Sequence, residues 1–377
     1  MAKEVKILFL TLHTFSLTGG IEKVCRIFSK VLQDLSSEKY GTYKFSKILS
    51  LCDHPNDVDE AYCPKKYFSA FRYRKTAFGM VAIYNSLKSD ILILSHINLI
   101  PIAYFLRLFS KRKRIILFAH GIEVWRDLTD WKVNFLKKHV EIWAVSQFTK
   151  QVLQQKHKID SHNIKVLNNC LDPYFDPPQD FKKPDYLLER FEVRKEQPVI
   201  LTISRISSHE LYKGYDLIIS CIPKILIHFP DLVYILAGKA DETEHARLTQ
   251  LIKENGMENH VIFASFIPNN ELVDFFLLAD VFVMPSKKEG FGMVFIEAAA
   301  CGCRVIAGNQ DGSKDALLNG QLGVLINAHS ISELVNAIHQ SLDDRKDQSA
   351  NSAQQQKCLA HFSYEHYLKK VGLLLNN

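Results

Sequence analysis

Residues 281–302 read VFVMPSKKEGFGMVFIEAAACG, which is a short apolar run, a glycine-containing loop and a second apolar run. The β-branched start predicts a strand that ends at Pro285, and the second run predicts a helix from about Met293 to Ala300. Gly290 and Gly292 stand directly before this helix. Backbone N–H groups at such a helix start approach an anion closely, and the helix dipole favours negative charge there. The stretch therefore predicts a strand, a phosphate-binding loop and a helix.

The same alternation of short β-branched runs and longer helical patterns extends through the whole chain. Alternation of this kind predicts the α/β class, with parallel sheets covered by helices on both faces. The predicted strands are Val5–Leu12, Phe45–Leu51, Ile91–Leu94, Arg114–Ala119, Glu141–Val145 and Ile164–Leu167 in the first half, and Val199–Ser204, Val233–Ala237, His260–Ala264, Val281–Pro285, Arg304–Ala307 and Gly323–Ile326 in the second.

The Asp- and Pro-rich stretch Asp172–Pro184 can continue neither a strand nor a helix, so it predicts a domain boundary. We expect Rossmann-like, doubly wound domains over residues 1–178 and 179–355. Residues 356–377 are expected to form a C-terminal helix that packs back on the N-terminal domain. Ligands of such sheets bind outside the carboxyl ends of the strands. The expected active site is therefore a cleft between two facing domains.

Composition fits this organisation. The chain has 377 residues, 47% hydrophobic and 23% charged, as expected for two ordinary globular domains. Its eight cysteines form no C-x-x-C pair, which favours buried thiols in a reducing cytoplasm over a zinc site or disulfides. The longest apolar region, Ile91–Phe109, contains His96, Asn98, Pro101 and Arg107, so a strand followed by a helix is expected there and not a membrane span.

Positive charge is concentrated in the first half. Residues 1–180 carry 27 Lys and Arg against 17 Asp and Glu, whereas the rest carries 20 against 24. The basic half indicates an anionic partner, either a phosphorylated substrate or a membrane surface, although a solvated basic face explains it equally well. Its basic runs are Lys65–Lys66, Arg72–Lys75 and Lys111–Arg114.

Two glutamates flank the glycine loop of the opening stretch. Glu289 lies in the loop and Glu297 within the helix. Six helical residues rise roughly 9 Å, so the two carboxylates can hold opposite ends of one elongated, hydroxyl-rich ligand. The alternative is a helix N-terminal charge and a solvent-facing Glu, which leaves unexplained why Glu297 stands among apolar residues.

Four further residues follow predicted strands or precede predicted helices. Arg205 follows one strand and Lys213 precedes a helix, so the two cations can clamp a diphosphate as it gains leaving-group charge. Gly20 stands before the first helix, where it allows close approach of a ligand. His120 follows a strand and precedes a glycine, a position that suits a catalytic or a structural histidine.

In this order the motifs resemble glycosyltransferase family 4, which has the GT-B fold. Glu289 and Glu297, with seven residues between them, resemble that family's E-x7-E signature. The resemblance extends over nearly the whole chain. The other matching segments are Gly19–Glu22, His120–Glu123, Ala144–Lys150, Val166–Asp172, Arg205, Lys213–Asp216 and Phe362–Glu365.

The resemblance implies a retaining hexosyltransferase that uses a UDP- or GDP-sugar, without a metal or other cofactor. It assigns the catalytic site to His120 and Glu289. The implied acceptor is a glycan or lipid-linked hydroxyl, in cell-surface polysaccharide biosynthesis at the inner face of the membrane. The implied donor-binding residues are Arg205 and Lys213 for the diphosphate, Glu289 with Gly290, Phe291, Gly292 and Met293 for the sugar, Glu297 for the ribose, and Gly20 for the diphosphate or acceptor.

One motif departs from the family pattern, and other functions stay open. Asn169-Cys170 stands where the family has Asn-Gly, and the single D-x-D, Asp57-Val-Asp59, is far in sequence from the cations. A GT-B sugar-nucleotide epimerase or a phosphorylase shares the fold. A nicotinamide or flavin enzyme needs G-x-G-x-x-G after its first strand, which is missing. The basic runs lack a nucleic-acid-binding motif, so we expect a peripheral contact with an anionic membrane and no nucleic acid.

Overall fold

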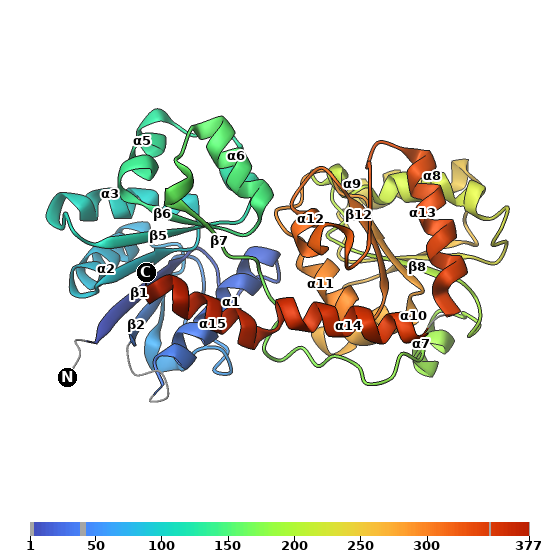
Figure 1. Ribbon diagram of the computed structural model, residues 1–377, viewed down its shortest axis with the longest axis horizontal. Coiled ribbons are helices and arrows are strands. Elements are labelled where there is room, and N and C mark those ends of the chain that lie inside the picture. The colour runs from blue at the N-terminus through green and yellow to red at the C-terminus, as the bar shows by residue number, and fades with distance from the viewer. Residues whose placement is uncertain (1–3, 38–42, 347, 377) are drawn as a thin grey trace. The chain divides into compact units, whose positions relative to one another are not determined.

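A computed structural model describes residues 4–37, 43–346 and 348–376. The chain divides into two compact units (Figure 1). The first unit comprises residues 1–173 and 364–377, and the second comprises residues 174–363. The connection therefore leaves the first unit slightly before the boundary expected at residue 178, within the same Asp- and Pro-rich stretch.

The first unit has a seven-stranded, fully parallel sheet in the order β3-β2-β1-β4-β5-β6-β7. All six predicted strands are present, within two residues at each end. The additional strand, β3, has three residues and is too short to give a pattern in the sequence. The strands are β1 (Val5–Thr11), β2 (Tyr43–Ser50), β3 (Phe68–Ala70), β4 (Ile91–Leu94), β5 (Arg114–Ala119), β6 (Glu141–Ala144) and β7 (Ile164–Val166).

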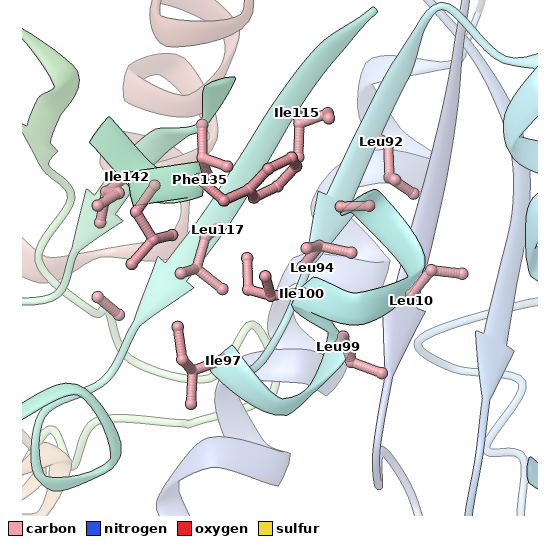
Figure 2. Close-up of a cluster of buried hydrophobic side chains, with 14 of the residues drawn as sticks. Leu10, Leu92, Leu94, Ile97, Leu99, Ile100, Ile115, Leu117, Phe135 and Ile142 are labelled. Carbon is pink, nitrogen blue, oxygen red and sulfur yellow. The ribbon is translucent and has the colours of Figure 1, made fainter. Parts of the chain in front are cut away.

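Helices cover both faces of this sheet. On one face, α2 (Lys75–Lys88), α3 (Ile100–Phe109), α5 (Asp130–His139) and α6 (Gln147–His157) bury alternate strand residues in an aliphatic core, which Figure 2 shows around Leu94 and Leu117. On the other face, α1 (Gly20–Leu35) packs Phe28 against Phe9 and Phe118 with ring centroids 5.1 and 4.8 Å apart. The short α4 (Ile122–Trp125) follows β5.

The second unit repeats the plan with a six-stranded parallel sheet in the order β10-β9-β8-β11-β12-β13. The predicted doubly wound α/β class is confirmed for both units. The strands are β8 (Val199–Ile203), β9 (Val233–Ala237), β10 (Val261–Ala264), β11 (Val281–Met284), β12 (Arg304–Gly308) and β13 (Val324–Ile326). The helices are α7 (Asp185–Arg190), α8 (Tyr215–Ile225), α9 (Glu242–Glu254), α10 (Leu272–Leu278), α11 (Met293–Ala300), α12 (Ser313–Ala316), α13 (Ile331–Asp343) and α14 (Gln348–Phe362).

The C-terminal segment is two helices, not the single helix expected over residues 356–377. Helix α14 belongs to the second unit, where the Gln355 side chain donates to the carbonyl oxygen of Ala300 at 2.9 Å. Ser363, a residue favoured at helix N-termini, separates it from α15 (Tyr364–Asn376). Helix α15 packs on α1 of the first unit, where the Tyr364 hydroxyl donates to Asp34 at 2.7 Å. Only this last helix returns to the first unit.

The strand order positions the candidate site. In each sheet the order in which the chain adds strands reverses once, between β1 and β4 in the first unit and between β8 and β11 in the second. At such a switch point the loops after the two strands diverge and leave room for a ligand at the carboxyl edge. Within the described ranges, no helix is both long and apolar enough to cross a membrane.

Candidate active site

The loop after β11 holds Glu289 by its backbone. The N–H of Glu289 donates to Oδ2 of Asp311 at 2.6 Å, and its carbonyl oxygen accepts from the N–H of Gly312 at 2.8 Å. A side chain at position 312 is excluded, because its Cβ would lie 2.0 Å from the carbonyl oxygen of Gly290. The loops after β11 and β12 thus meet backbone to backbone, and this contact fixes where the Glu289 side chain begins.

Gly292 turns the chain from this loop into α11. Its φ of 84° lies in the left-handed region, and a Cβ there would lie 2.4 Å from the ring of Phe295. No side chain caps the start of α11. The N–H of Phe295 donates to the carbonyl oxygen of Gly292 at 3.1 Å, and the start of the helix keeps the orientation that favours an anion or hydroxyl ligand.

Lys213 and Glu289 form the central ion pair of this edge. Lys213 ends a 3₁₀ turn (Leu211–Lys213) before α8, and its Nζ lies 2.6 Å from Oε2 of Glu289. Both side chains are largely buried, at 14% and 18% exposed. Burial acts to lower the pKa of Lys213, but the charge and hydrogen bond of Glu289 outweigh it, so the pKa lies above its usual value. Lys213 is therefore a permanent cation beside the glycine loop.

Arg205 joins the same group of charges from the loop after β8. Its guanidinium lies 3.0 Å from Oε1 of Glu210, and its side chain is 68% exposed. The Tyr212 hydroxyl lies within electrostatic reach of Arg205, Glu210, Lys213 and Glu289. Because an exposed Arg is cheaply reoriented, this arrangement supplies one fixed and one adjustable cation.

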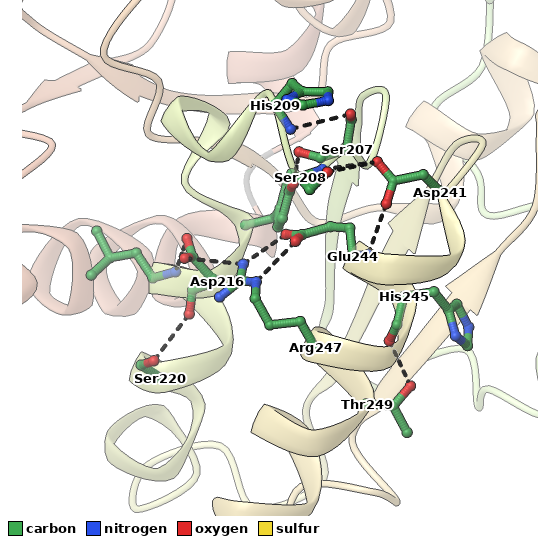
Figure 3. A network of polar contacts seen from close by, with 12 residues as sticks. Ser207, Ser208, His209, Asp216, Ser220, Asp241, Glu244, His245, Arg247 and Thr249 are labelled. Atoms are coloured by element: carbon green, nitrogen blue, oxygen red, sulfur yellow. Dashed lines mark hydrogen bonds and ion pairs between the residues drawn. The ribbon is translucent and has the colours of Figure 1, made fainter.

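A polar network supports the loop that carries Arg205, as Figure 3 shows. Oδ2 of Asp241 accepts from the N–H of Ser208 at 2.9 Å, and its Oδ1 accepts from a first-turn N–H of α9. Arg247 of α9 donates to Asp216 of α8 at 3.3 Å. The network therefore connects the loop to helices α8 and α9. The sequence did not indicate this network, because each of its residues looks like an ordinary polar surface residue.

The other residues predicted for the donor are mostly buried. Glu297 lies in α11 and is 5% exposed. The Phe291 ring is buried against Phe362 of α14, with centroids 5.7 Å apart, so its side chain is taken up by packing. Met293 begins α11 and is also buried. Gly290 is partly exposed and Gly292 is buried, whereas Lys287 and Lys288 are the exposed residues of the loop.

His120 stands at the carboxyl end of β5 in the first unit. Its Nε2 lies 2.9 Å from the carbonyl oxygen of Ser95, which can only accept, so Nε2 carries the proton and Nδ1 is the acceptor. The ring stacks on Phe118 at an interplanar angle of 13°. Burial lowers the pKa of His120 to about 4, although the Ser95 carbonyl and the charge of Glu22 act in the opposite direction. The imidazole is therefore neutral at neutral pH.

Two acids hold backbone segments in this part of the first unit. Glu123 accepts from the backbone N–H of His120 at 2.6 Å, and burial raises its pKa. Asp53, after β2, is fully buried and accepts from the N–H groups of Thr14, Phe15 and Ser16 at 2.8, 3.2 and 3.3 Å. Asp53 thereby shapes the loop that leads to Gly20. Its signal in the sequence was an Asp just past a predicted strand.

Gly20 begins α1 at the same edge. A Cβ at this position would meet nothing within 4 Å, and its φ is not in the left-handed region. Neither packing nor backbone conformation therefore requires glycine here. The charge of Glu22, on the first turn of α1, acts on His120, so the helix start and the histidine are near each other.

The structure thus gathers the predicted residues in two places, one in each unit. Arg205, Lys213 and Glu289 converge in the second unit, and Gly20 and His120 share an edge of the first. The D-x-D motif is engaged in turns, where Asp57 accepts from His54 N and Asp59 from Ala61 N. Across the described ranges, no group of three His, Cys, Asp or Glu side chains is placed to hold a metal ion.

The match to a family of known proteins falls within the second unit. The family model described as Glycosyl transferases group 1 matches residues 187–357. A GDP-mannose-dependent alpha-(1-6)-phosphatidylinositol monomannoside mannosyltransferase from Mycolicibacterium smegmatis is 30% identical over 162 residues, which are 41% of this chain and 41% of that protein. The putative glycosyltransferase YtcC of Bacillus subtilis is 26% identical over 330 residues, 84% of this chain and 77% of that protein.

Solved structures are similar over the full length. The Anabaena protein Alr3699/HepE, in complex with UDP-glucose, has a TM-score of 0.79 and 20% identity, covering 99% of this chain and all of that one. The sucrose-phosphate synthase of Thermosynechococcus elongatus has a TM-score of 0.78 and 17% identity, covering 99% of this chain and 98% of that one. At these identities the likeness concerns the fold, and the expected GT-B fold is confirmed.

Proposed function

Residues 187–357 belong to the Glycosyl transferases group 1 family, and from this premise we propose that the chain is a retaining glycosyltransferase. It transfers a hexosyl residue from a nucleotide-diphosphate sugar to a hydroxyl group of a glycan or lipid-linked acceptor. The observation that carries the proposal is the Lys213–Glu289 pair at the sheet's switch point, with Arg205 beside it. A fixed cation, an adjustable cation and a carboxylate lie near a helix start. A diphosphate needs the cations, and the hydroxyl groups of a sugar need the carboxylate.

Each group has a proposed partner on the donor. Lys213 and Arg205 bind the diphosphate, and Glu289 accepts hydrogen bonds from sugar hydroxyls. The backbone of Gly290–Met293 lines the sugar, and Glu297, on the following helix, binds the ribose hydroxyls. Direct pairing of Lys213 with Glu289 supports this division, because a ligand that spans both residues satisfies the cation with phosphate and the carboxylate with hydroxyl groups.

The chemistry is a substitution at the anomeric carbon. The bond from that carbon to the β-phosphate oxygen breaks, and its electron pair leaves with the diphosphate, whose growing charge Lys213 and Arg205 stabilise. The acceptor hydroxyl oxygen attacks from the same face, and its proton passes to the departing phosphate oxygen. The configuration is then retained through an oxocarbenium-like state. We propose the neutral His120, with its Nδ1 lone pair, as the acceptor of a hydrogen bond from a sugar hydroxyl.

Two observations support a phosphorylated or lipid-linked acceptor in cell-surface polysaccharide biosynthesis. The first half of the chain is strongly basic, with 27 Lys and Arg against 17 Asp and Glu in residues 1–180. The Mycolicibacterium relative is described as acting on a phosphatidylinositol monomannoside, and other relatives are described as D-inositol 3-phosphate glycosyltransferases.

The test is slow hydrolysis of donors in the absence of an acceptor. The purified chain is incubated with a panel of UDP- and GDP-sugars, and release of the nucleoside diphosphate and the anomer of the free sugar are followed by NMR. One donor should be hydrolysed with retention. Glu289→Ala should abolish the release, whereas Glu258→Ala, on the exposed surface of the same unit, should keep it.

Three results would count against the proposal. A Glu289→Ala variant as active as the wild type removes Glu289 from the site, and an inverted product rules out retention. An altered sugar that remains attached to its diphosphate identifies the alternative function, a sugar-nucleotide epimerase with the same fold.

A further inference from the structure

Two neighbouring helices of the first unit expose apolar outer faces. On α2, Met80, Tyr84 and Leu87 recur at helical spacing and are exposed, with Met80 at 68%. On α3, Leu108 and Phe109 are 63% and 71% exposed. Both helices also bury apolar residues against the sheet, so they are apolar on both sides. Such helices belong in an interior or against another apolar phase.

This surface, which we term the α2–α3 face, continues onto the next helix. The face consists of the exposed side chains of Met80, Tyr84, Leu87, Tyr104, Phe105, Leu108 and Phe109. The Tyr104 ring packs against Trp131 of α5, itself exposed, with centroids 5.5 Å apart. Aromatic rings with polar edges are typical of side chains at a membrane–water interface.

The charge on the stretch of chain that forms the two helices is almost entirely positive. Residues 72–114, which include both helices, contain nine Lys and Arg and a single acid, Asp90. That acid is already engaged, because it accepts from the backbone N–H of Lys6 at 2.9 Å. On α2 itself, Lys88 lies over the Tyr84 ring, 3.9 Å from its centroid. An apolar face with cationic neighbours is complementary to an anionic lipid surface.

A basic hollow of about 410 Å³ opens beside the C-terminal end of α3. It lies where β5, β6 and β7 begin, at the edge of the sheet opposite His120 and Gly20. Arg107 connects it to the α2–α3 face: it is on α3, and its guanidinium donates to the carbonyl oxygens of Lys111 and His139 at 2.5 and 3.0 Å. The cationic lining includes Arg107, Lys111, Arg112, Lys113, Lys138 and Lys165.

We propose that the first unit docks on an anionic lipid bilayer, with the α2–α3 face at the boundary of head groups and acyl chains and the basic hollow around lipid phosphates. The hollow has the size of a small-ligand site. Its lining holds six Lys and Arg against the acid Glu141, which already pairs with Arg114 at 2.9 Å, and this excess of cations suits phosphate. A second copy of the chain is the other candidate for covering the face. A symmetric pair would bring the same cations together from both sides with fewer acids to neutralise them, so the charge favours lipid.

The experiment is sedimentation with vesicles, using the full chain without nucleotide sugar, so its result is independent of the transfer reaction. Vesicles of phosphatidylcholine alone are compared with vesicles that contain about 30% phosphatidylglycerol, at roughly 0.05 M and 0.5 M salt. Two double variants test the two components: Leu108→Ser with Phe109→Ser for the face, and Lys111→Ser with Arg112→Ser for the hollow. The altered residues are exposed or at the rim, so folding is checked by thermal unfolding.

Matched controls change equally exposed residues elsewhere. Leu373→Ser, 65% exposed on α15, combined with Ile227→Ser, 76% exposed on the second unit, is the apolar control. Lys195→Ser combined with Lys253→Ser, both exposed in the second unit, is the charge control.

We expect the wild type and both controls to bind the anionic vesicles at low salt, and to release them at high salt. Each test variant should bind at least about tenfold more weakly. Absence of binding to anionic vesicles at low salt overturns the proposal, as does binding that neither test variant weakens. A wild-type dimer that the Leu108/Phe109 variant converts to a monomer, without vesicle binding, assigns the face to a second copy instead.

Discussion

The Nζ of Lys213 and Oε2 of Glu289 lie 2.6 Å apart, although the two residues come from loops that follow different strands. The pair spans the switch point of the second sheet, between β8 and β11. After burial itself, Glu289 has the largest effect on the pKa of Lys213. The proposed donor must engage both residues together.

The first prediction concerns this coupling. Lys213→Met and Glu289→Gln should each lower the free energy of unfolding, because each leaves a largely buried charge without its ion partner. The double variant should recover about 1–2 kcal/mol relative to the sum of the two, since the side chains retain some exposure. Urea unfolding of the four proteins measures the coupling. Donor hydrolysis should be lost in all three variants. If the losses of stability in the two single variants simply add in the double variant, the two residues are not coupled.

The second prediction concerns the turn into α11. Gly292→Ala forces an L-residue to a φ of 84° and brings its Cβ to 2.4 Å from the Phe295 ring. Gly256→Ala is the control, because its φ is 66° and nothing lies within 4 Å of the added Cβ. Thermal unfolding should show that Gly292→Ala costs about 1–3 kcal/mol more than the control, and only Gly292→Ala should weaken donor binding. Equal losses of stability in the two variants would mean that the loop adjusts to the added Cβ without cost.

The third prediction separates stability from activity at Gly20. An added Cβ meets nothing within 4 Å, so Gly20→Ala should leave stability unchanged or raise it by up to about 1 kcal/mol. Turnover should nevertheless fall at least about tenfold if a ligand approaches this backbone. Gly79→Ala, also unobstructed and inside α2, should be stabilising without loss of turnover. A fully active Gly20→Ala would remove Gly20 from the site.

The fourth prediction is a pH dependence set by Asp311. Burial raises its pKa to about 6 from a usual value of 3.8. The hydrogen bonds that Asp311 accepts from the N–H groups of Glu289 and Ser313 act in the opposite direction. Both carboxylate oxygens accept from these N–H groups, so protonation disturbs the loop that holds Glu289. Below pH 6 the KM for the donor should therefore rise. Kinetics of the wild type and Asp311→Asn, compared between pH 5 and 8, measure the effect, which the variant should lack.

The same group affects stability in the opposite direction. A carboxyl group with a raised pKa in the folded state contributes stability that is fully present below its unfolded pKa of 3.8 and is lost as the pH rises through about 6. The loss amounts to roughly 2–3 kcal/mol. Asp311→Asn should flatten this part of the stability profile, whereas the exposed Asp343→Asn should follow the wild type. A profile that Asp311→Asn leaves unchanged would contradict the raised pKa.

Most of the fold could be predicted from local pattern. The predicted strand Ile91–Leu94 agrees with β4 in both ends, because a parallel strand buried on both faces appears as a continuous apolar run. Strand β3 and the interruption at Ser363 could not be predicted in this way. The first is too short to show a period, and the second depends on which unit each side of the break can pack against.

The site was predicted less completely than the fold. Glu289 and the glycine loop carry a recognisable spacing, whereas Asp311 and Asp53 do not. An Asp in a loop looks the same in the sequence whether it is solvated or buried against backbone N–H groups. The apolar stretch of α3 posed the same difficulty, because its pattern cannot say that Leu108 and Phe109 face outward.

The sequence by itself determined the two-part α/β organisation and the glycine loop at the start of α11, since these follow from patterns within a few neighbouring residues. Only the tertiary structure decided that Lys213 meets Glu289, that Asp311 holds the Glu289 backbone, and that the α2–α3 face is exposed. These relationships join segments that are far apart in the chain. They depend on the order in which the strands pair and on which helix faces the sheet leaves uncovered.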